Sequence, residues 1–351
     1  MSDQRAESES RSCARVIRLA RVSPERELAV VASLAQRPGT CALVIAELTG
    51  DAASLGRFQR EGRSLAQLEL RRLCGGRSTR YGDGIVSVCA LAPSPRAWIP
   101  EPGRLTGPRI LNRLVRGVLA GLSRLGVPAS YPGRDFVSAN GRRLAYVSLS
   151  REPSGVVVFQ AVLGVGVPYT TEEREPSWPG LPQPPTASSL ARERVPLPEF
   201  EAIARAFCAG FAGRFSLALD ESPPTRDEER AFAAGTRPPL VDPALAGLAC
   251  AGALATPIGD LEAHVALDAG GRLARVRLRG DWIAAQAELE KLETALVCEN
   301  PGSARVRELC EAWLANPDSL VVGLIGASAL ADAIASSARA YSSSGARPGS
   351  P

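Results

Sequence analysis

The chain of 351 residues has almost no lysine or histidine. Lys291 is the only lysine, so nearly all of the 41 basic residues are arginine, and His264 is the only histidine. The eight cysteines are scattered, and none forms a Cys-x-x-Cys pair. A zinc or iron–sulfur site is therefore not expected, and no metal ligands are assigned. We interpret His264 as structural and most cysteines as small buried side chains.

Long apolar runs are also missing. No stretch of eighteen or more apolar residues occurs, which predicts no transmembrane helix and no membrane partner. The N-terminal segment lacks the apolar core of a signal peptide, so we expect a cytoplasmic protein. The net charge of +4 is too small to indicate a nucleic-acid partner. With 45% apolar and 22% charged residues, the composition is that of an ordinary globular protein.

The hydrophobic pattern alternates between helical and strand periods along the chain. It predicts helices over residues 25–35, 109–125, 199–215 and 225–234, and strands over 42–47, 85–92, 136–138, 143–150 and 156–165. Asn140-Gly141 indicates a hairpin turn. A last unit opens with a hairpin at 261–278, followed by helices over 284–296, 303–315 and 328–341.

Residues 71–84, RRLCGGRSTRYGDG, are the most informative stretch. Glycine permits a positive φ and lets backbone amides approach a ligand, and arginines around such amides favour a phosphate or carboxylate. We therefore predict an anion-binding loop made of Arg71, Arg72, Gly75, Gly76 and Arg77. The alternative is a tight turn with solvated arginines. Under either interpretation the loop is expected at the surface, so Arg72→Ala should cost little stability.

Several short segments occur in an order that resembles the lipoate–protein ligase family. They are Glu27-Leu28-Ala29, Leu55–Gln59, the Arg71–Gly76 loop, Gly133-Arg134-Asp135 and Gly141–Ala145, followed by the C-terminal hairpin and Gly280-Asp281-Trp282. The resemblance spans roughly residues 15–335. It implies a member of the biotin/lipoate ligase and octanoyltransferase superfamily with an α/β (α+β) fold. That fold has a mixed β-sheet with flanking helices and a small C-terminal α+β accessory domain.

The resemblance also suggests how the chain divides. We expect a disordered start at 1–14, a lipoate-ligase-like catalytic-type domain at 15–235, a linker at 236–257, an accessory domain at 258–341 and a disordered tail at 342–351. The activity implied is ATP-dependent activation of lipoate or octanoate to an acyl-adenylate. The acyl group then passes to a lysine of a lipoyl domain or a glycine-cleavage H-type protein. ATP and Mg²⁺ are the cofactors implied.

Carried onto this chain, the family pattern gives an acyl-adenylate site of Arg71, Arg72, Gly75, Gly76, Arg77, Arg134 and Asp135. Arg143 stands at the position of the family's catalytic lysine, which stabilises negative charge in the transition state. The family's His-Asp pair after the glycine turn is replaced by Tyr81-Gly82. These changes predict a degenerate or altered active site.

Three alternatives remain open for the activity. The chain could be a non-catalytic member that binds an acyl group, a nucleotide or a lipoyl domain. It could be a biotin–protein ligase, although its glycine loop differs from that family's. Cys74 could be a nucleophile, as in octanoyltransferases, although those enzymes carry their cysteine elsewhere and no histidine in this stretch could act as its base.

Overall fold

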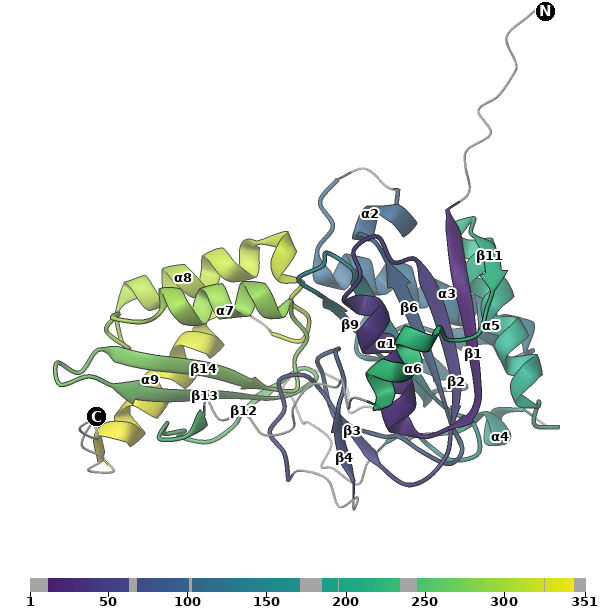
Figure 1. Cartoon of the computed structure of the whole chain (residues 1–351). Helices are drawn as coiled ribbons and strands as arrows, with labels where there is room; N and C mark the ends of the chain where they lie inside the picture. The colour runs from purple at the N-terminus through teal and green to yellow at the C-terminus, as the bar shows by residue number, and fades with distance from the viewer. Residues whose placement is uncertain are drawn as a thin grey trace, which may run out of the picture.

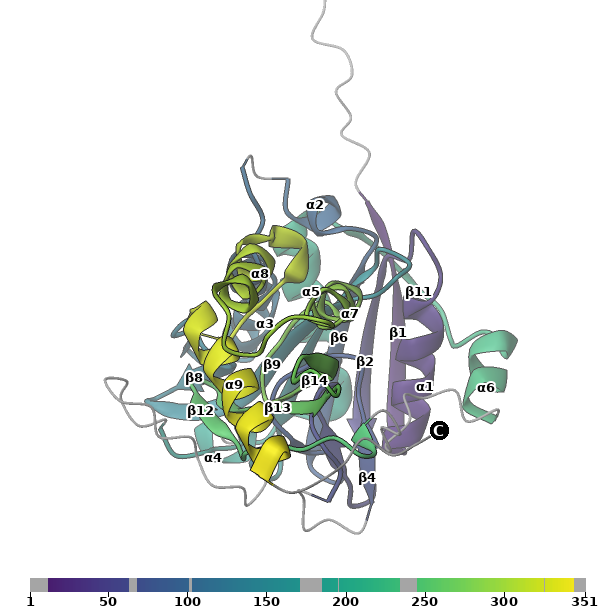
Figure 2. The same cartoon turned by 90° about the vertical axis from the view of Figure 1, so that its left-hand side faces the viewer.

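The structure is a computed structural model that describes residues 12–62, 68–100, 103–170, 185–194, 196–233, 245–324 and 326–343. Two units lie side by side (Figure 1). The larger contains the N-terminal two thirds of the chain. The smaller contains the helices and hairpin of the C-terminal third, and Figure 2 views the molecule from its side.

An eight-stranded mixed sheet forms the larger unit, in the order β11-β1-β2-β6-β10-β9-β8-β7. The strands are β1 (Cys13–Val22), β2 (Ala42–Leu48), β6 (Ile85–Ala92), β7 (Ala129–Ser130), β8 (Phe136–Ala139), β9 (Arg142–Arg151), β10 (Val157–Gly164) and β11 (Ala218–Glu221). β1 runs parallel to both of its neighbours, and the other pairs are antiparallel. The fold class expected from the sequence, a mixed sheet with flanking helices, is confirmed.

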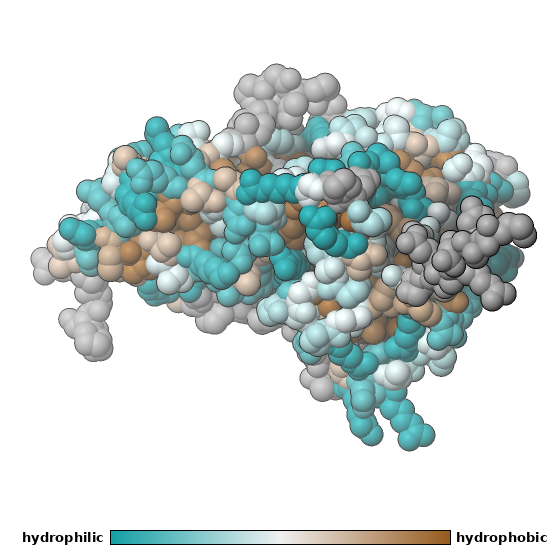
Figure 3. All heavy atoms as spheres, turned by 90° about the horizontal axis from the view of Figure 1, so that it is seen from above, coloured by the Kyte–Doolittle hydropathy of each residue, from teal (hydrophilic) through white to brown (hydrophobic). Residues whose placement is uncertain are grey.

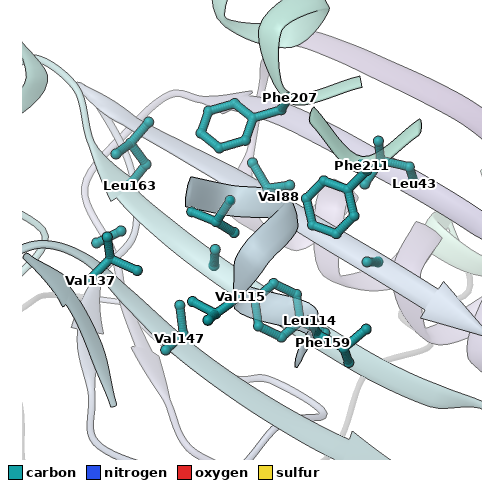
Figure 4. Packing of buried hydrophobic residues seen from close by; sticks show 14 of the residues in the cluster. Leu43, Val88, Leu114, Val115, Val137, Val147, Phe159, Leu163, Phe207 and Phe211 are labelled. Carbon is teal, nitrogen blue, oxygen red and sulfur yellow. The ribbon is translucent and has the colours of Figure 1, made fainter. Parts of the chain in front are cut away.

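Helices cover both faces of this sheet because its central strands are apolar on both sides. α3 (Gly107–Arg124) and α5 (Phe200–Phe215) pack on one face over a core that includes Leu43, Val88, Phe159 and Phe211 (Figure 4). α1 (Pro24–Ala35) covers the other face, where Val44, Cys89 and Val158 lie. The short helices α2 (Pro95–Trp98), α4 (Leu190–Glu193) and α6 (Arg226–Ala233) complete the unit.

A small sheet of β3 (Ala53–Leu55), β4 (Glu69–Arg71) and β5 (Thr79–Arg80) carries the glycine loop. The C-terminal unit has its own sheet of β12 (Leu254–Thr256), β13 (Gly259–Leu267) and β14 (Leu273–Gly280). It is packed with α7 (Gln286–Ala295), α8 (Ala304–Ala315), α9 (Ala327–Ser343) and the 3₁₀ turn η2 (Pro317–Ser319). The helices and the hairpin predicted for this unit are therefore present.

Some boundaries differ from those expected. Cys13 and Ala14, assigned to a disordered start, begin β1, and Ser342 and Ser343, assigned to the tail, end α9. Residues 254–256, assigned to the linker, form β12. Residues 1–11 of the expected start, the linker residues 236–244 and the tail from 344 lie outside the described residues.

Hydrophilic side chains cover much of the upper face of both units, with apolar residues showing in smaller areas between them (Figure 3). Within the described residues, no helix is both long and apolar enough to cross a membrane.

Candidate functional site

Arg72 is the centre of the glycine loop, and it is only 1% exposed. Its guanidinium donates to the carbonyl oxygens of Ser54 at 2.7 Å, Gly75 at 2.9 Å and Arg77 at 2.6 Å. It also donates to the Tyr146 hydroxyl at 3.0 Å. The expectation that this arginine is at the surface is therefore wrong. It uses its planar fork of donors to bind backbone carbonyls of the loop itself.

Arg71 has a similar internal role one residue earlier. Its Nη1 atom donates to the carbonyl oxygens of Gly56, Arg57 and Gln59, at 3.1, 2.9 and 2.5 Å. The side chain is 7% exposed. The two arginines thus hold the glycine loop and the segment at residues 54–59 in fixed relative positions.

The backbone of Gly75 and Gly76 is bound from two directions. The Gly75 carbonyl accepts hydrogen bonds from the hydroxyls of Tyr146 and Ser148 on β9, at 3.0 and 2.8 Å. The Gly76 amide donates to the carbonyl oxygen of Trp282, in the C-terminal unit, at 2.9 Å. Gly76 has a φ of 88°, and a Cβ atom there would lie 1.7 Å from the Tyr146 hydroxyl. An amide that could bind an anion therefore already has a protein acceptor.

Arg77, Arg134 and Asp135 lie near one another at the side of the loop. Arg77 Nε donates to Asp135 Oδ2 at 2.9 Å, and the Asp135 side chain is fully buried. Arg134 donates to the carbonyl oxygen of Pro257 at 2.6 Å, close to the start of the C-terminal unit. The structure thus brings together two of the residues expected in the site and directs the third toward the joint between units.

Arg143 is in the second position of β9 and is 4% exposed. Its backbone bonds to the segment that follows the undescribed residues 171–184, because its amide donates to Thr186 and its carbonyl accepts from Ser188. It faces Ser138 on β8, where the strand register shifts. Arg143, which the sequence analysis matched to the family lysine, is therefore a buried arginine.

A buried polar cluster that the sequence did not reveal lies under α1. The Glu27 carboxylate is completely buried and accepts from the hydroxyls of Tyr81 at 2.7 Å and Ser87 at 2.9 Å, and from the Cys89 thiol at 3.2 Å. Gln160 donates to the Tyr81 hydroxyl at 2.8 Å. Burial raises the pKa of Glu27, of Tyr81 and of the Cys89 thiol. Tyr81 and Gln160 thus belong to one internal network.

Cys74 lies in the interior beside this cluster. Burial raises the pKa of its thiol to about 12, and the thiol contacts the Val158 carbonyl at 3.4 Å. A thiol with so high a pKa is not a nucleophile near neutral pH, so the structure does not support the octanoyltransferase-like alternative.

The space next to the loop is small. A cavity of about 10 Å³ is lined by Leu28, Val31, Arg71, Arg72, Leu73, Cys74, Cys89, Val158 and Gln160. That volume corresponds to about one water molecule. An acyl-adenylate is far larger, and the loop groups that would hold it bind carbonyls of the protein. This cavity, as the described residues line it, therefore does not accommodate ATP or an acyl-adenylate.

The joint between the units is formed by Phe58 and Gln59, which precede the glycine loop, and by residues 280–282 of the C-terminal unit. Phe58 stacks on Trp282 with ring centroids 4.8 Å apart and planes 11° apart. Gln59 accepts from the Gly56 amide at 2.7 Å and donates to Asp281 Oδ1 at 2.6 Å. The Gly280 amide donates to the Phe58 carbonyl at 2.9 Å. Gly280-Asp281-Trp282 therefore joins the C-terminal unit to the loop.

Comparisons with known proteins identify the fold. No known family model and no curated protein matches the sequence. Among solved structures, the chain is similar to P. falciparum LipL1 in complex with lipoate, with a TM-score of 0.58 and 10% identity, covering 92% of this chain and 98% of that one. A lipoate protein ligase from Thermoplasma acidophilum matches with a TM-score of 0.49 and 14% identity, covering 64% and 91%. A biotin protein ligase from Leishmania major matches with a TM-score of 0.34 and 13% identity, covering 76% and 98%.

The similarity to LipL1 extends over both units and establishes a shared fold, including the C-terminal unit. At 10% identity it says nothing about the reaction. The arrangement of the loop must therefore decide between the functional alternatives.

Proposed function

We propose that this chain is a non-catalytic member of the lipoate–protein ligase family that binds a lipoyl-domain or H-type carrier protein and does not activate an acyl group with ATP. The hydrogen bond from the Gly76 amide to Trp282 carries this proposal. Together with the bonds of Arg71 and Arg72 to carbonyls, it engages loop donors that could otherwise bind an acyl-adenylate. Of the ligands that the family resemblance implies for a non-catalytic member, we choose the carrier protein because its binding does not require the donors of the glycine loop.

Active lipoate–protein ligase is the second candidate, and one observation favours it. Arg143 remains a buried cation at the lysine position. A guanidinium and an ammonium differ in shape and hydration, so the exchange would alter the geometry at a reacting phosphate. An active ligase would also require the Gly76 amide to break its hydrogen bond to the Trp282 carbonyl and to form one with the ligand.

ATP–pyrophosphate exchange, with lipoate and with octanoate, separates the two candidates. We expect no exchange above background with either acid, in the wild type or in Arg143→Lys. Calorimetry with a purified lipoyl domain should detect one-to-one binding. Arg305→Ala, an exposed arginine on α8, provides the matched control and should behave as the wild type.

Two results would contradict the proposal. Exchange that disappears in Arg143→Ala but persists in Arg305→Ala would identify an active ligase. Absence of both exchange and carrier binding would remove the carrier protein as the partner, and both candidates would then be wrong.

A further inference from the structure

Three side chains of types that ligate metals converge in the C-terminal unit, away from the glycine loop. They are Cys250, Glu262 and His264, and one ligand atom from each lies within 4.8 Å of the other two. Across the ranges that the structure describes, no other set of three Cys, His, Asp or Glu side chains meets this condition. The set includes the only histidine of the chain.

Strand pairing places these three residues on one face. Glu262 and His264 are two positions apart on β13, so their side chains point to the same side. Ala249 pairs with Val265 through backbone hydrogen bonds in both directions, at 2.8 and 2.9 Å. Cys250 consequently lies beside His264. Glu262 is 2% exposed and His264 is 4% exposed, whereas Cys250 is partly exposed.

We propose that Cys250, Glu262 and His264 form a site for a thiophilic divalent metal ion, with Zn²⁺ as the best match. Thiolate, imidazole and carboxylate are the ligands of zinc in proteins, and three protein ligands leave a fourth position for water. In a tetrahedral zinc site neighbouring ligand atoms lie about 3.3 to 3.6 Å apart. His264 Nε2 and Glu262 Oε2 are 3.0 Å apart. All three ligand atoms lie within 4.8 Å of one another, so a closure of at most about 1 Å completes the site.

The charges around the cluster are compatible with a divalent ion. A Cys250 thiolate and the Glu262 carboxylate bring two negative charges. Arg60 Nε lies 2.7 Å from Glu262 Oε2, but the Arg60 side chain is 48% exposed. It can therefore move or remain as an outer partner of the carboxylate. The Cys250 sulfur lies beside the backbone of Gly252, 3.4 Å from its amide nitrogen and 3.6 Å from its carbonyl oxygen.

Two further arginines face the cluster from β14, because Arg277 is opposite His264 and Arg279 is opposite Glu262. Both reach the carboxylate of Glu293 on α7, at 3.1 and 3.3 Å. Glu293 also accepts from the Leu278 amide on the outer edge of β14. These contacts draw positive charge toward that edge, whereas Cys250 approaches β13 from its other side.

The expectation of no metal site came from ligand spacing in the sequence. His264 alternates with apolar residues, and Cys250 has no cysteine nearby. Only the pairing of Ala249 with Val265 brings the sulfur to the hairpin.

Cobalt substitution in the reduced, untagged full-length protein tests the proposal. We expect one equivalent of Co²⁺ to bind, with a thiolate-to-cobalt charge-transfer absorption and the strong visible bands of tetrahedral coordination. Zn²⁺ should displace it. Cys250→Ser and His264→Gln should weaken binding by about tenfold or more. Cys298→Ser, which changes an exposed cysteine of the same unit, should leave binding unchanged.

A second measurement uses only the wild type, so it does not depend on whether the variants fold. Zn²⁺ should raise the melting temperature and protect Cys250, but not Cys298, from alkylation mapped by mass spectrometry. The proposal is wrong if reduced wild type binds no stoichiometric metal. It is also wrong if the charge-transfer band survives in Cys250→Ser, or if Zn²⁺ protects both cysteines equally.

Discussion

The Gly76 amide and the Trp282 carbonyl oxygen lie 2.9 Å apart, and this bond joins the two units in the middle of the glycine loop. The amide most suited to bind an anion thus has its acceptor within the protein. Four predictions follow from this internally bonded loop and the buried cluster beside it.

Replacement of Arg72 by Met should reduce the free energy of unfolding by about 3 kcal/mol or more, because several buried acceptors lose their donor together. Urea denaturation measures the change. Arg305→Met, at an exposed position of α8, should change stability by about 0.5 kcal/mol or less. A loss below about 1 kcal/mol in Arg72→Met would mean that the carbonyls find other donors and that the loop tolerates rearrangement.

Replacement of Trp282 by Ala should cost about 3 to 5 kcal/mol, the range for large aromatic residues in a core. Trp282 is completely buried between Phe58, on which it stacks, and Trp313, which meets it edge-on at 5.8 Å. Trp282→Phe should cost less, since it keeps a stacked ring. Equal losses in the two variants, measured by urea denaturation, would show that ring stacking does not stabilise the joint.

Gly76→Ala should destabilise the protein, because the new methyl group would overlap the Tyr146 hydroxyl and the φ of 88° disfavours alanine. The same change in a Tyr146→Phe background should cost less, since the nearest clashing atom is gone. A double-mutant cycle measures the difference. Additive effects would show that backbone strain, and not the contact with Tyr146, sets the cost.

Glu27→Gln should stabilise the protein increasingly as pH rises. An unfolded glutamate ionises near pH 4.3, whereas burial raises the pKa of Glu27 in the folded state. The wild type therefore loses stability as pH rises from about 4.3 through the folded pKa, because the unfolded state releases the proton first. The glutamine variant lacks this loss. Denaturation midpoints of both proteins between pH 4 and 8 test the prediction.

Glu193 provides a control of opposite sign. Arg142 holds the pKa of Glu193 at about 2. Its contribution to stability is present above the unfolded pKa and is lost as pH falls through about 2. Glu193→Gln should be less stable than the wild type at neutral pH, with a difference that shrinks on acidification. If the two variants showed the same pH trend, a global charge effect would replace the local explanation.

Much of the fold could be predicted from the sequence where the local pattern is clean. β6 has the predicted bounds, and the hairpin at Asn140-Gly141 forms as its turn residues indicate. β1 was not predicted, because Arg15, Arg18 and Arg21 interrupt its apolar alternation. Two of these arginines form ion pairs with residues distant in the sequence. Arg15 pairs with Glu228, and Arg18 pairs with Glu201 and Glu221.

The sequence singled out the residues of the glycine loop, but it did not predict their hydrogen bonds. Arginines beside glycines indicate guanidinium donors next to accessible backbone amides. These donors can bind either a ligand anion or the protein's own carbonyl oxygens. Which of the two occurs depends on Tyr146, Ser148 and Trp282, which approach the loop from distant parts of the chain. Glu27 was missed as a buried group because a glutamate in the first turn of a helix is usually exposed.

The amide proton of Gly76 lies in the hydrogen bond to the Trp282 carbonyl, between the two units. Its exchange with solvent therefore depends on how the joint opens. That proton can exchange with solvent only when the C-terminal unit separates from the loop or the loop itself opens. The rate of its replacement by deuterium therefore measures how often the joint opens by either route, without any ligand or activity being known.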